Sequence, residues 1–196
     1  MSDDRAYLQG LLDATAAGAT CTLPTGTFTV SQSPAGYYCL NVPAGVRVLG
    51  SGTTVMQAAG IGASVRLFQL SGAGATLERL TLDGNAANQS ADEHRAGAFI
   101  SAADCTVRDV VAQDFTGDGL YGYVGCEGLS VIDCTCINNG RNGLTLSAGS
   151  EIRVYRGLYN GNAAQQIDSE PGAPWTVSDV TIADAIIGCA PGQYAL

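Results

Sequence analysis

Apolar and polar positions alternate along this chain in short runs, and the runs repeat. Five eight-residue segments superimpose without a gap: 75–82, 105–112, 129–136, 152–159 and 175–182. Each segment reads apolar-x-apolar, two polar or turn residues, and again apolar-x-apolar. Successive segments are offset by 30, 24, 23 and 23 residues. A repeat of this length that holds two short alternating strands predicts a solenoid, in which each turn covers its neighbours.

The alternation also predicts which side chains face the core, because successive side chains of a strand point to opposite faces. In the predicted core, Gly157 leaves a gap and Tyr159 is bulky with a polar tip, and their shared strand suggests that they compensate each other. The four inward columns are Ala75, Cys105, Leu129, Ile152, Trp175; Leu77, Val107, Val131, Val154, Val177; Leu80, Val110, Cys134, Gly157, Val180; and Leu82, Ala112, Cys136, Tyr159, Ile182.

The two-residue corner between the paired strands is polar. Its second position carries a charge in every repeat, namely Arg79, Asp109, Asp133, Arg156 and Asp179. The stacking predicts that Arg156 contacts Asp133 on one side and Asp179 on the other. Such contacts contribute little when they are exposed.

A third strand is predicted to close each coil. Gly, Asn and Asp residues at 83–85, 138–140 and 160–162 form turns, because they tolerate positive φ and bond to the turn backbone. Short alternating runs follow at 97–101, 119–123, 143–147 and 166–170. Three strands in a coil of this length describe an all-β fold, a parallel β-helix.

The pattern continues upstream in looser form. Residues 45–50 resemble the first strand and corner of another coil, and residues 65–70 resemble its closing strand. Residues 4–17 carry apolar side chains at helical spacing, with acidic residues before them and Gly18 after them. We expect this helix to lie across the open first coil. The chain then divides into a capping helix, residues 1–19, and one β-helix domain, residues 20–196.

Composition narrows the functional classes. A chain of 196 residues, 46% hydrophobic and 14% charged, can bury the core of a single domain. Its net charge of −9 argues against nucleic acid as a partner and gives no general attraction to anionic membranes. No run reaches transmembrane length, and the first residues lack a signal peptide. The chain is expected to start in the cytosol, unless a leader or a larger parent has been removed.

Seven cysteines are present. Cys105, Cys134 and Cys136 fall in inward columns, and Cys21 alternates in the same sense with Leu23, so we predict buried thiols. Cys134-x-Cys136 also suits a metal pair, but no second pair has zinc-like spacing and the chain has one histidine. We therefore assign no metal and no cofactor. Cys39, Cys126 and Cys189 lie near predicted loops.

The layout resembles the pectate-lyase-like superfamily of right-handed parallel β-helices over nearly the whole chain. The helix followed by Cys21-Thr-Leu-Pro-Thr-Gly-Thr-Phe-Thr-Val30 is similar to the cap and first strand of these proteins, and Leu80-Thr-Leu-Asp-Gly-Asn85 is another recurrent phrase. The resemblance implies a right-handed helix and a virion or extracellular location. It specifies activity weakly, because the superfamily includes polysaccharide lyases, hydrolases, epimerases and bacteriophage tailspikes.

The phrase at 80–85 also occurs in mannuronan C5-epimerases. Their Tyr-Gly-Phe-Asp-Pro-His catalytic phrase would fall on Asp118-Gly-Leu-Tyr-Gly-Tyr123, which lacks its Tyr, Asp and His. Epimerase function is therefore not carried over to this chain.

The outer face of the closing strands holds the first candidate site, because substrates of such helices usually lie along one outer face. Asp168 and Glu170 are candidate catalytic acids, with Cα atoms about 6.6 Å apart, near the ~6.5–9.5 Å carboxyl separation of inverting glycosidases. The alternative is a polar turn with solvated acids. The candidate substrate-binding residues are Phe99, Tyr121, Tyr123, Thr145 and Ser147. Tyr121 and Tyr123 would stack on sugars or, alternatively, pack on a neighbouring chain.

The second candidate site is the loop of the longest repeat, residues 83–95, because insertions project from the scaffold and often carry function. It places His94 beside Asp92, where a general acid or base is one interpretation and a solvated loop tip the other.

Two functions compete on this basis. The first is a glycan-recognising module of tailspike-like or secreted polysaccharide-active type. If this module also cleaves the glycan, it is a polysaccharide hydrolase or lyase. The second is a non-catalytic structural or decorating component of a virion or surface assembly. Nothing in the sequence caps the last coil, and Pro191 and Gly192 do not cover the core beneath them. We expect a partner there, either another copy (a trimer, by resemblance to tailspikes) or a domain absent from this chain.

Overall fold

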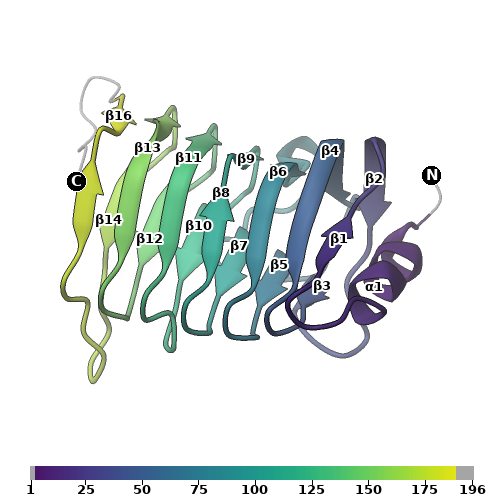
Figure 1. The fold of residues 1–196 in the computed structure, drawn as a ribbon. Helices are drawn as coiled ribbons and strands as arrows, with labels where there is room; N and C mark the ends of the chain where they lie inside the picture. Colours follow the sequence, from purple (N-terminus) through teal and green to yellow (C-terminus); the bar gives the residue numbers. More distant parts are fainter. Residues whose placement is uncertain (1–2, 189–196) are drawn as a thin grey trace.

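The computed structural model describes residues 3–188. Parallel strands stack into successive coils, and one helix lies at the N-terminal end of the stack (Figure 1). All strand pairs are parallel and fall into two sheets. Sheet A contains β1 (Thr20–Thr22), β2 (Gly26–Val30), β4 (Arg47–Gln57), β6 (Thr76–Asp83), β8 (Thr106–Arg108), β9 (Val111–Gln113), β11 (Ser130–Ile137), β13 (Arg153–Asn160), β15 (Thr181–Ala183) and β16 (Ile186–Ile187). Sheet B contains β3 (Tyr38–Val42), β5 (Arg66–Leu70), β7 (Ala96–Ile100), β10 (Asp118–Gly122), β12 (Leu144–Leu146) and β14 (Ile167–Ser169). The predicted parallel β-helix is confirmed.

Sheet A holds the first and second strands of each coil, which meet at a corner. The corner residue has left-handed backbone angles in successive coils: φ is 58° at Arg79, 50° at Asp109, 55° at Asp133 and 54° at Arg156. This conformation turns the chain while both flanking strands keep their pairing. Charged side chains therefore project outward there, and Arg156 forms the predicted contact with Asp133, with nitrogen–oxygen distances of 2.5 and 2.7 Å.

The core is a set of apolar columns. Leu77, Val107, Val131 and Val154 are fully buried and are register partners on successive coils. All described cysteines are buried and free, including Cys39 and Cys126, which the pattern places near loops. Cys189 lies outside the described residues. The predicted inward columns are confirmed for the first four repeats.

The fifth repeat was predicted in the wrong register. Val154 pairs with Ile182 rather than with Val177, and Leu158 pairs with Ile186. The last coil therefore begins at Val180, and its corner is Asp184, with φ of 57°, rather than Asp179. The chain inserts five more residues before this coil, and the segment 180–187 alternates as well as 175–182 does. Trp175, predicted to be inward, is 42% exposed.

Gly157 has a backbone role rather than leaving a gap. Its φ is 115°, and a Cβ there would lie 2.4 Å from the carbonyl oxygen of Cys134. A side chain is thus excluded by the neighbouring coil. Tyr159, two residues on, is fully buried.

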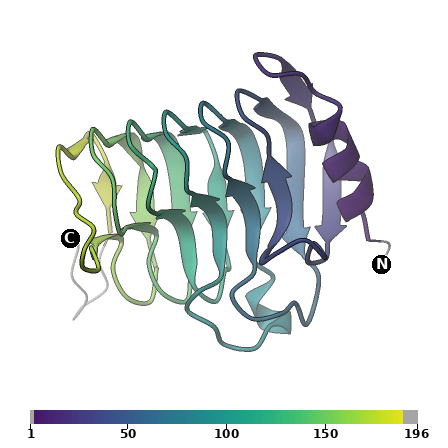
Figure 2. The same ribbon diagram turned by 90° about the horizontal axis from the view of Figure 1, so that it is seen from below.

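The helix α1 (Arg5–Asp13) lies across the N-terminal coil (Figure 2), as predicted. Leu8 and Leu12 are fully buried against the core. Gln9 exchanges hydrogen bonds with the backbone of Asn41 in β3, at 2.9 and 3.0 Å. The helix thereby covers the strand edge and the apolar interior at this end. No helix among residues 3–188 is long and apolar enough to cross a membrane.

Candidate functional site

The outer face of sheet B carries more side chains than simple alternation predicts. In β10, Gly119 and Leu120 both face the core: a Cβ on Gly119 would lie 3.3 Å from the Cβ of Cys136, and Leu120 is fully buried. Asp118 and Tyr121, three residues apart, therefore both project outward, as their contacts below show. The register extends this spacing to neighbouring coils, where Ala96 pairs with Arg66 and Asp118, and Phe99 pairs with Tyr121.

Four aromatic rings form a continuous strip along this face, which we call the aromatic strip. Phe99 and Tyr121 stack with centroids 5.5 Å apart and planes at 15°. Tyr123 lies 5.2 Å from Phe99 and 5.8 Å from Trp175. All four side chains are partly exposed. A strip of this kind offers apolar ring faces together with hydroxyl groups, the combination that suits contact with sugar rings.

A hollow of about 460 Å³ opens at the end of the strip. Ala96 leaves it open, because the neighbours of Ala96 in register are the longer Arg66 and Asp118. The guanidinium of Arg66 lies 4.3 Å above the ring of Phe99. The other lining residues are His94, Phe99, Tyr121 and Tyr123.

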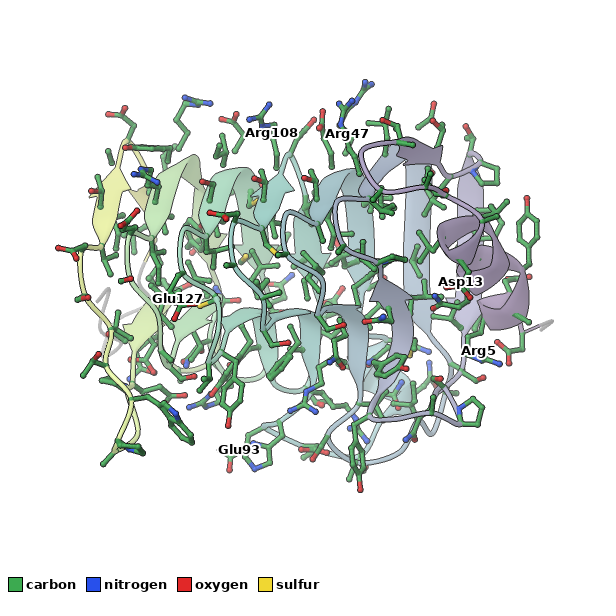
Figure 3. The ribbon with its side chains drawn as sticks, turned by 60° about the horizontal axis from the view of Figure 1, so that its bottom comes forward. Arg5, Asp13, Arg47, Glu93, Arg108 and Glu127 are labelled. Carbon is green, nitrogen blue, oxygen red and sulfur yellow. The ribbon has the colours of Figure 1, made fainter. Side chains whose placement is uncertain are left out.

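Beside the strip, Arg141 binds several carboxylates. Its guanidinium donates to Asp118, at 2.9 Å, and to Glu170, and it lies 3.9 Å from Glu93. Arg141 is 23% exposed and Asp118 only 1%, whereas Glu170 keeps 35% of its side chain accessible. We call Asp118, Arg141, Asp168 and Glu170 the acidic cluster. Figure 3 shows Glu93 on the face opposite to Arg47 and Arg108.

Burial and neighbouring charge shift the acid–base equilibria of the cluster. Burial raises the pKa of Asp118 to about 6, against the lowering influence of Arg141 and the amide of Asn142. Burial and the adjacent Glu170 raise the pKa of Asp168. Burial opposes the charge on Arg141, but hydrogen bonds and attraction from Glu170 and Asp118 outweigh it and raise the pKa of Arg141. The cluster therefore combines the cation of Arg141 with two carboxyl groups, those of Asp118 and Asp168, whose pKa values are raised.

Asn142 organises the cluster across three coils. Its backbone amide donates to Asp118 at 3.0 Å, and its side-chain amide donates to Thr145 at 2.9 Å and to Asp168 at 3.1 Å. Its side-chain oxygen accepts the amide of Gln165 at 3.0 Å. Asn142 thus holds the carboxyl groups of Asp118 and Asp168 in place.

The structure brings Asp168 and Glu170 together on the outer face, as their spacing indicated. The two carboxyl groups lie near enough for Glu170 to raise the pKa of Asp168. On β10, the residue in register with Asp168 is Tyr121, through Thr145 of β12. Asp118 lies three residues before Tyr121 on the same strand. The guanidinium of Arg141 contacts both Asp118 and Glu170 and therefore links these two carboxyl groups.

The expectation that Thr145 and Ser147 contact substrate needs correction. Thr145 is fully buried and Ser147 is 6% exposed, because polar neighbours cover both. Thr145 accepts from Asn142, and Ser147 donates to the carbonyl of Gly122 and contacts Tyr121. In this structure Thr145 supports Asn142, and Ser147 supports Tyr121. Phe99, Tyr121 and Tyr123 remain accessible.

The loop at 83–95, which includes a short 3-10 turn, η1 (Ala86–Asn88), is anchored rather than free. Arg95 is 1% exposed and its guanidinium donates to the carbonyls of Ile61, Gly62 and Ser90. Burial opposes the negative charge of Asp92, but hydrogen bonds from the backbone amides of Ser64 and His94 outweigh it and lower the pKa of Asp92. Asp92 is thereby engaged with backbone, and the exposed His94 stands at the rim of the hollow.

Sequence reasoning missed Arg66, Asp118, Arg141 and Trp175. Strict alternation back from Tyr121 places Asp118 inside, and only the consecutive inward pair Gly119 and Leu120 reverses this assignment. Arg141 lies in a turn between strands, where periodicity carries no information. Among residues 3–188, no three His, Cys, Asp or Glu side chains come together as a metal site requires.

Comparison with known proteins supports the fold. No family model matches the chain, and no curated protein matches it by sequence. The A-module of mannuronan C-5 epimerase AlgE4 from Azotobacter vinelandii is 22% identical, with a TM-score of 0.64 over 95% of this chain and 68% of that one. The tailspike gp49 of Acinetobacter baumannii bacteriophage Fri1, a capsular polysaccharide depolymerase, is 17% identical, with a TM-score of 0.73 over 94% of this chain. ORF18 of Geobacillus virus E2 is 12% identical, with a TM-score of 0.66.

This chain spans 39% of the length of each of the two viral proteins. At these identities the likeness concerns the fold and not the activity. The expected resemblance to polysaccharide-active β-helix proteins is thus confirmed at the level of architecture, and this chain is a parallel β-helix of the kind those proteins share.

Proposed function

We propose that the outer face of sheet B is a glycan-binding surface. The observation that carries this proposal is the aromatic strip, which runs along an otherwise polar face directly beside the acidic cluster. Stacked, partly exposed rings provide sugar contacts, and fixed carboxyl groups and amides provide hydrogen bonds. The neighbour described as a capsular polysaccharide depolymerase, which has the same architecture, supports this direction.

The same face supplies acid–base chemistry for cleaving a bound glycan. Asp168 tends to hold a proton because of its burial and of Glu170. Arg141 donates a hydrogen bond to Glu170. A proton donor next to a carboxylate is what a polysaccharide hydrolase or lyase needs to protonate a leaving group and accept a proton. Asp118 is covered by Arg141, so we assign it a positioning role.

A glycan array with wild-type protein tests binding, and cleavage of the glycans retained tests catalysis. Asp168→Asn and Glu170→Gln should each abolish turnover and leave the melting temperature nearly unchanged. Glu127→Gln makes the same change of charge at an exposed position outside the cluster and should have no effect. Turnover that survives in both cluster variants would refute the catalytic assignment, and a protein that binds no glycan at high concentration would refute the whole proposal.

The second candidate, a non-catalytic structural or decorating protein, is favoured by the exposed apolar side chains of the last coil. Val180 and Ile186 are 37% and 67% exposed there. Oligomeric assembly without glycan binding would support this candidate.

A further inference from the structure

The hollow at the end of the aromatic strip contains a positive charge without a negative partner. Among the described residues, the Arg66 guanidinium forms no ion pair and donates no hydrogen bond, and its Nε is buried without a partner. Its ordered contact is the face of Phe99. A buried donor nitrogen normally forms a hydrogen bond, because a buried donor without a partner costs free energy.

The other arginines near this face are satisfied. Arg95 directs its guanidinium to backbone carbonyls and to Thr116. Arg141 is neutralised by Asp118 and Glu170. Arg66 thus differs from its neighbours in having free donors at the wall of an open hollow. Asp92 is the carboxylate that attracts Arg66, and both of its carboxylate oxygens accept backbone amides instead.

The shape of the hollow admits a sugar substituent. Ala96 provides a floor without bulk, and Tyr121 and Tyr123 provide walls next to Phe99. A sugar that stacks on the aromatic strip would therefore project a substituent toward Arg66. Because a guanidinium is planar and bidentate, it matches an oxyanion better than a hydroxyl group.

We propose that the hollow over Ala96 binds an anionic substituent of a glycan, a carboxylate or a sulfate, through the guanidinium of Arg66. This inference deepens the proposed glycan-binding function of the same face and rests on it. The protein carries a net charge of −9, which repels anionic polymers in general. Selection of an acidic glycan must therefore depend on this local cation.

Binding of the wild type and of Arg66→Gln to an array of neutral, carboxylated and sulfated glycans tests the inference. We expect the retained glycans to carry an anionic group and Arg66→Gln to bind them about tenfold or more weakly. Arg47→Gln is the matched control: it makes the same charge change on the opposite face, where Arg47 pairs with Glu78 at 2.8 Å (Figure 3). Arg47→Gln should bind like wild type.

Chemically matched glycans distinguish the source of the charge. If the anionic group is a carboxylate, reducing the carboxyl groups of a bound glycan should abolish the preference of the wild type for that glycan. If the group is a sulfate, desulfation should abolish this preference. Ala96→Leu, which fills the hollow without changing charge, should weaken binding to the same glycans. Its melting temperature and that of Arg66→Gln report whether each variant is folded.

The outcomes separate this inference from the proposed function. If the wild type prefers neutral glycans, or if folded Arg66→Gln binds as tightly as Arg47→Gln, the anion site is refuted and glycan binding by the face stands. If Ala96→Leu binds normally, the hollow is not the site. If the wild type binds no glycan, the proposed function is refuted and this inference with it.

Discussion

Val131 lies in the middle of an apolar column, fully buried between Val107 and Val154. Val131→Asp would place a charge in a dry interior without a partner, and we expect a loss of about 4 kcal/mol or more in the free energy of unfolding. Ser130→Asp is the control, because Ser130 faces outward next to Arg153. Urea unfolding measures both. Equal stability of the two variants would contradict the inward orientation of Val131 in β11.

Asp118 makes the stability of the protein depend on pH. Its pKa is raised from 3.8 to about 6 in the folded state, so the folded state binds the proton more tightly than the unfolded state. The stabilisation by this group is therefore complete below about pH 4 and is lost as the pH rises through 6. Asp118→Asn removes this dependence and keeps an acceptor for the amide of Asn142.

Between pH 4 and pH 7, the free energy of unfolding of Asp118→Asn relative to wild type should shift in favour of the variant by up to about 3 kcal/mol. Urea unfolding across this range measures the difference, with exposed Glu127→Gln as the control. A difference that stays flat with pH would show that Asp118 is ionised throughout.

At the level of single residues, the sequence predicted which side chains are buried better than it predicted which side chains contact one another. Hydrophobic alternation placed Val107, Val131 and Val154 correctly because one face of each strand must be dry. It could not show that Glu170 raises the pKa of Asp168, or that Thr145 is covered, because side-chain contacts across coils depend on rotamers. Arg66 carried no signal in the sequence, since an arginine on an outer strand face is usually solvated.

At the level of elements, the corner of each coil depends on one left-handed residue. Asp109 has φ of 50° and is exposed, between β8 and β9. Asp109→Val should cost about 1–2 kcal/mol, because a β-branched residue is disfavoured in this region. Asp109→Gly should be nearly neutral by the same reasoning. Thermal or urea unfolding compares the two variants, and equal destabilisation by both would assign the effect to the lost charge instead.

The elements that the sequence misjudged are those where strict alternation ends. The closing strands bury two consecutive residues, such as Gly119 and Leu120, and this shift brings Asp118 to the outer face. The last coil starts five residues later than predicted, because Val177 and Ile182 both fit an alternating pattern. Pairing with β13 decides between them, and pairing is a property of the neighbouring coil rather than of the segment itself.

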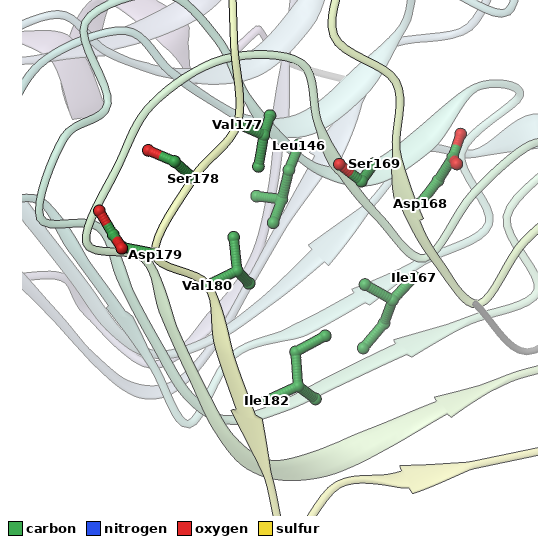
Figure 4. Close-up of a pocket in the computed structure, with 9 residues that line it drawn as sticks. All are labelled: Leu146, Ile167, Asp168, Ser169, Val177, Ser178, Asp179, Val180 and Ile182. Carbon is green, nitrogen blue, oxygen red and sulfur yellow. The ribbon is translucent and has the colours of Figure 1, made fainter.

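At the level of the whole molecule, the two ends differ. The helix α1 covers the N-terminal coil, whereas β14, β15 and β16 have a strand neighbour on one side only within residues 3–188. An apolar hollow of about 480 Å³ lies at that end, lined by residues such as Leu146, Ile167, Val180 and Ile182 (Figure 4). The end predicted to need a partner is therefore apolar where it is described. The segment 189–196, with Pro191 and Gly192, lies outside the described residues.

We expect copies of this chain to associate through the C-terminal end, because an exposed strand edge over apolar side chains is a template for pairing. Since α1 covers the opposite end, head-to-tail stacking is blocked, and the assembly should close as a small oligomer rather than grow into a filament.

Size-exclusion chromatography with light scattering measures this association. Ile186→Asp should shift the equilibrium toward monomer, because Ile186 is 67% exposed at this end. Tyr37→Asp is the control, since Tyr37 is 63% exposed but lies before β3, near the N-terminal coil. A wild-type protein that stays a stable, non-aggregating monomer at high concentration would contradict the prediction and would leave a domain absent from this chain as the expected cover.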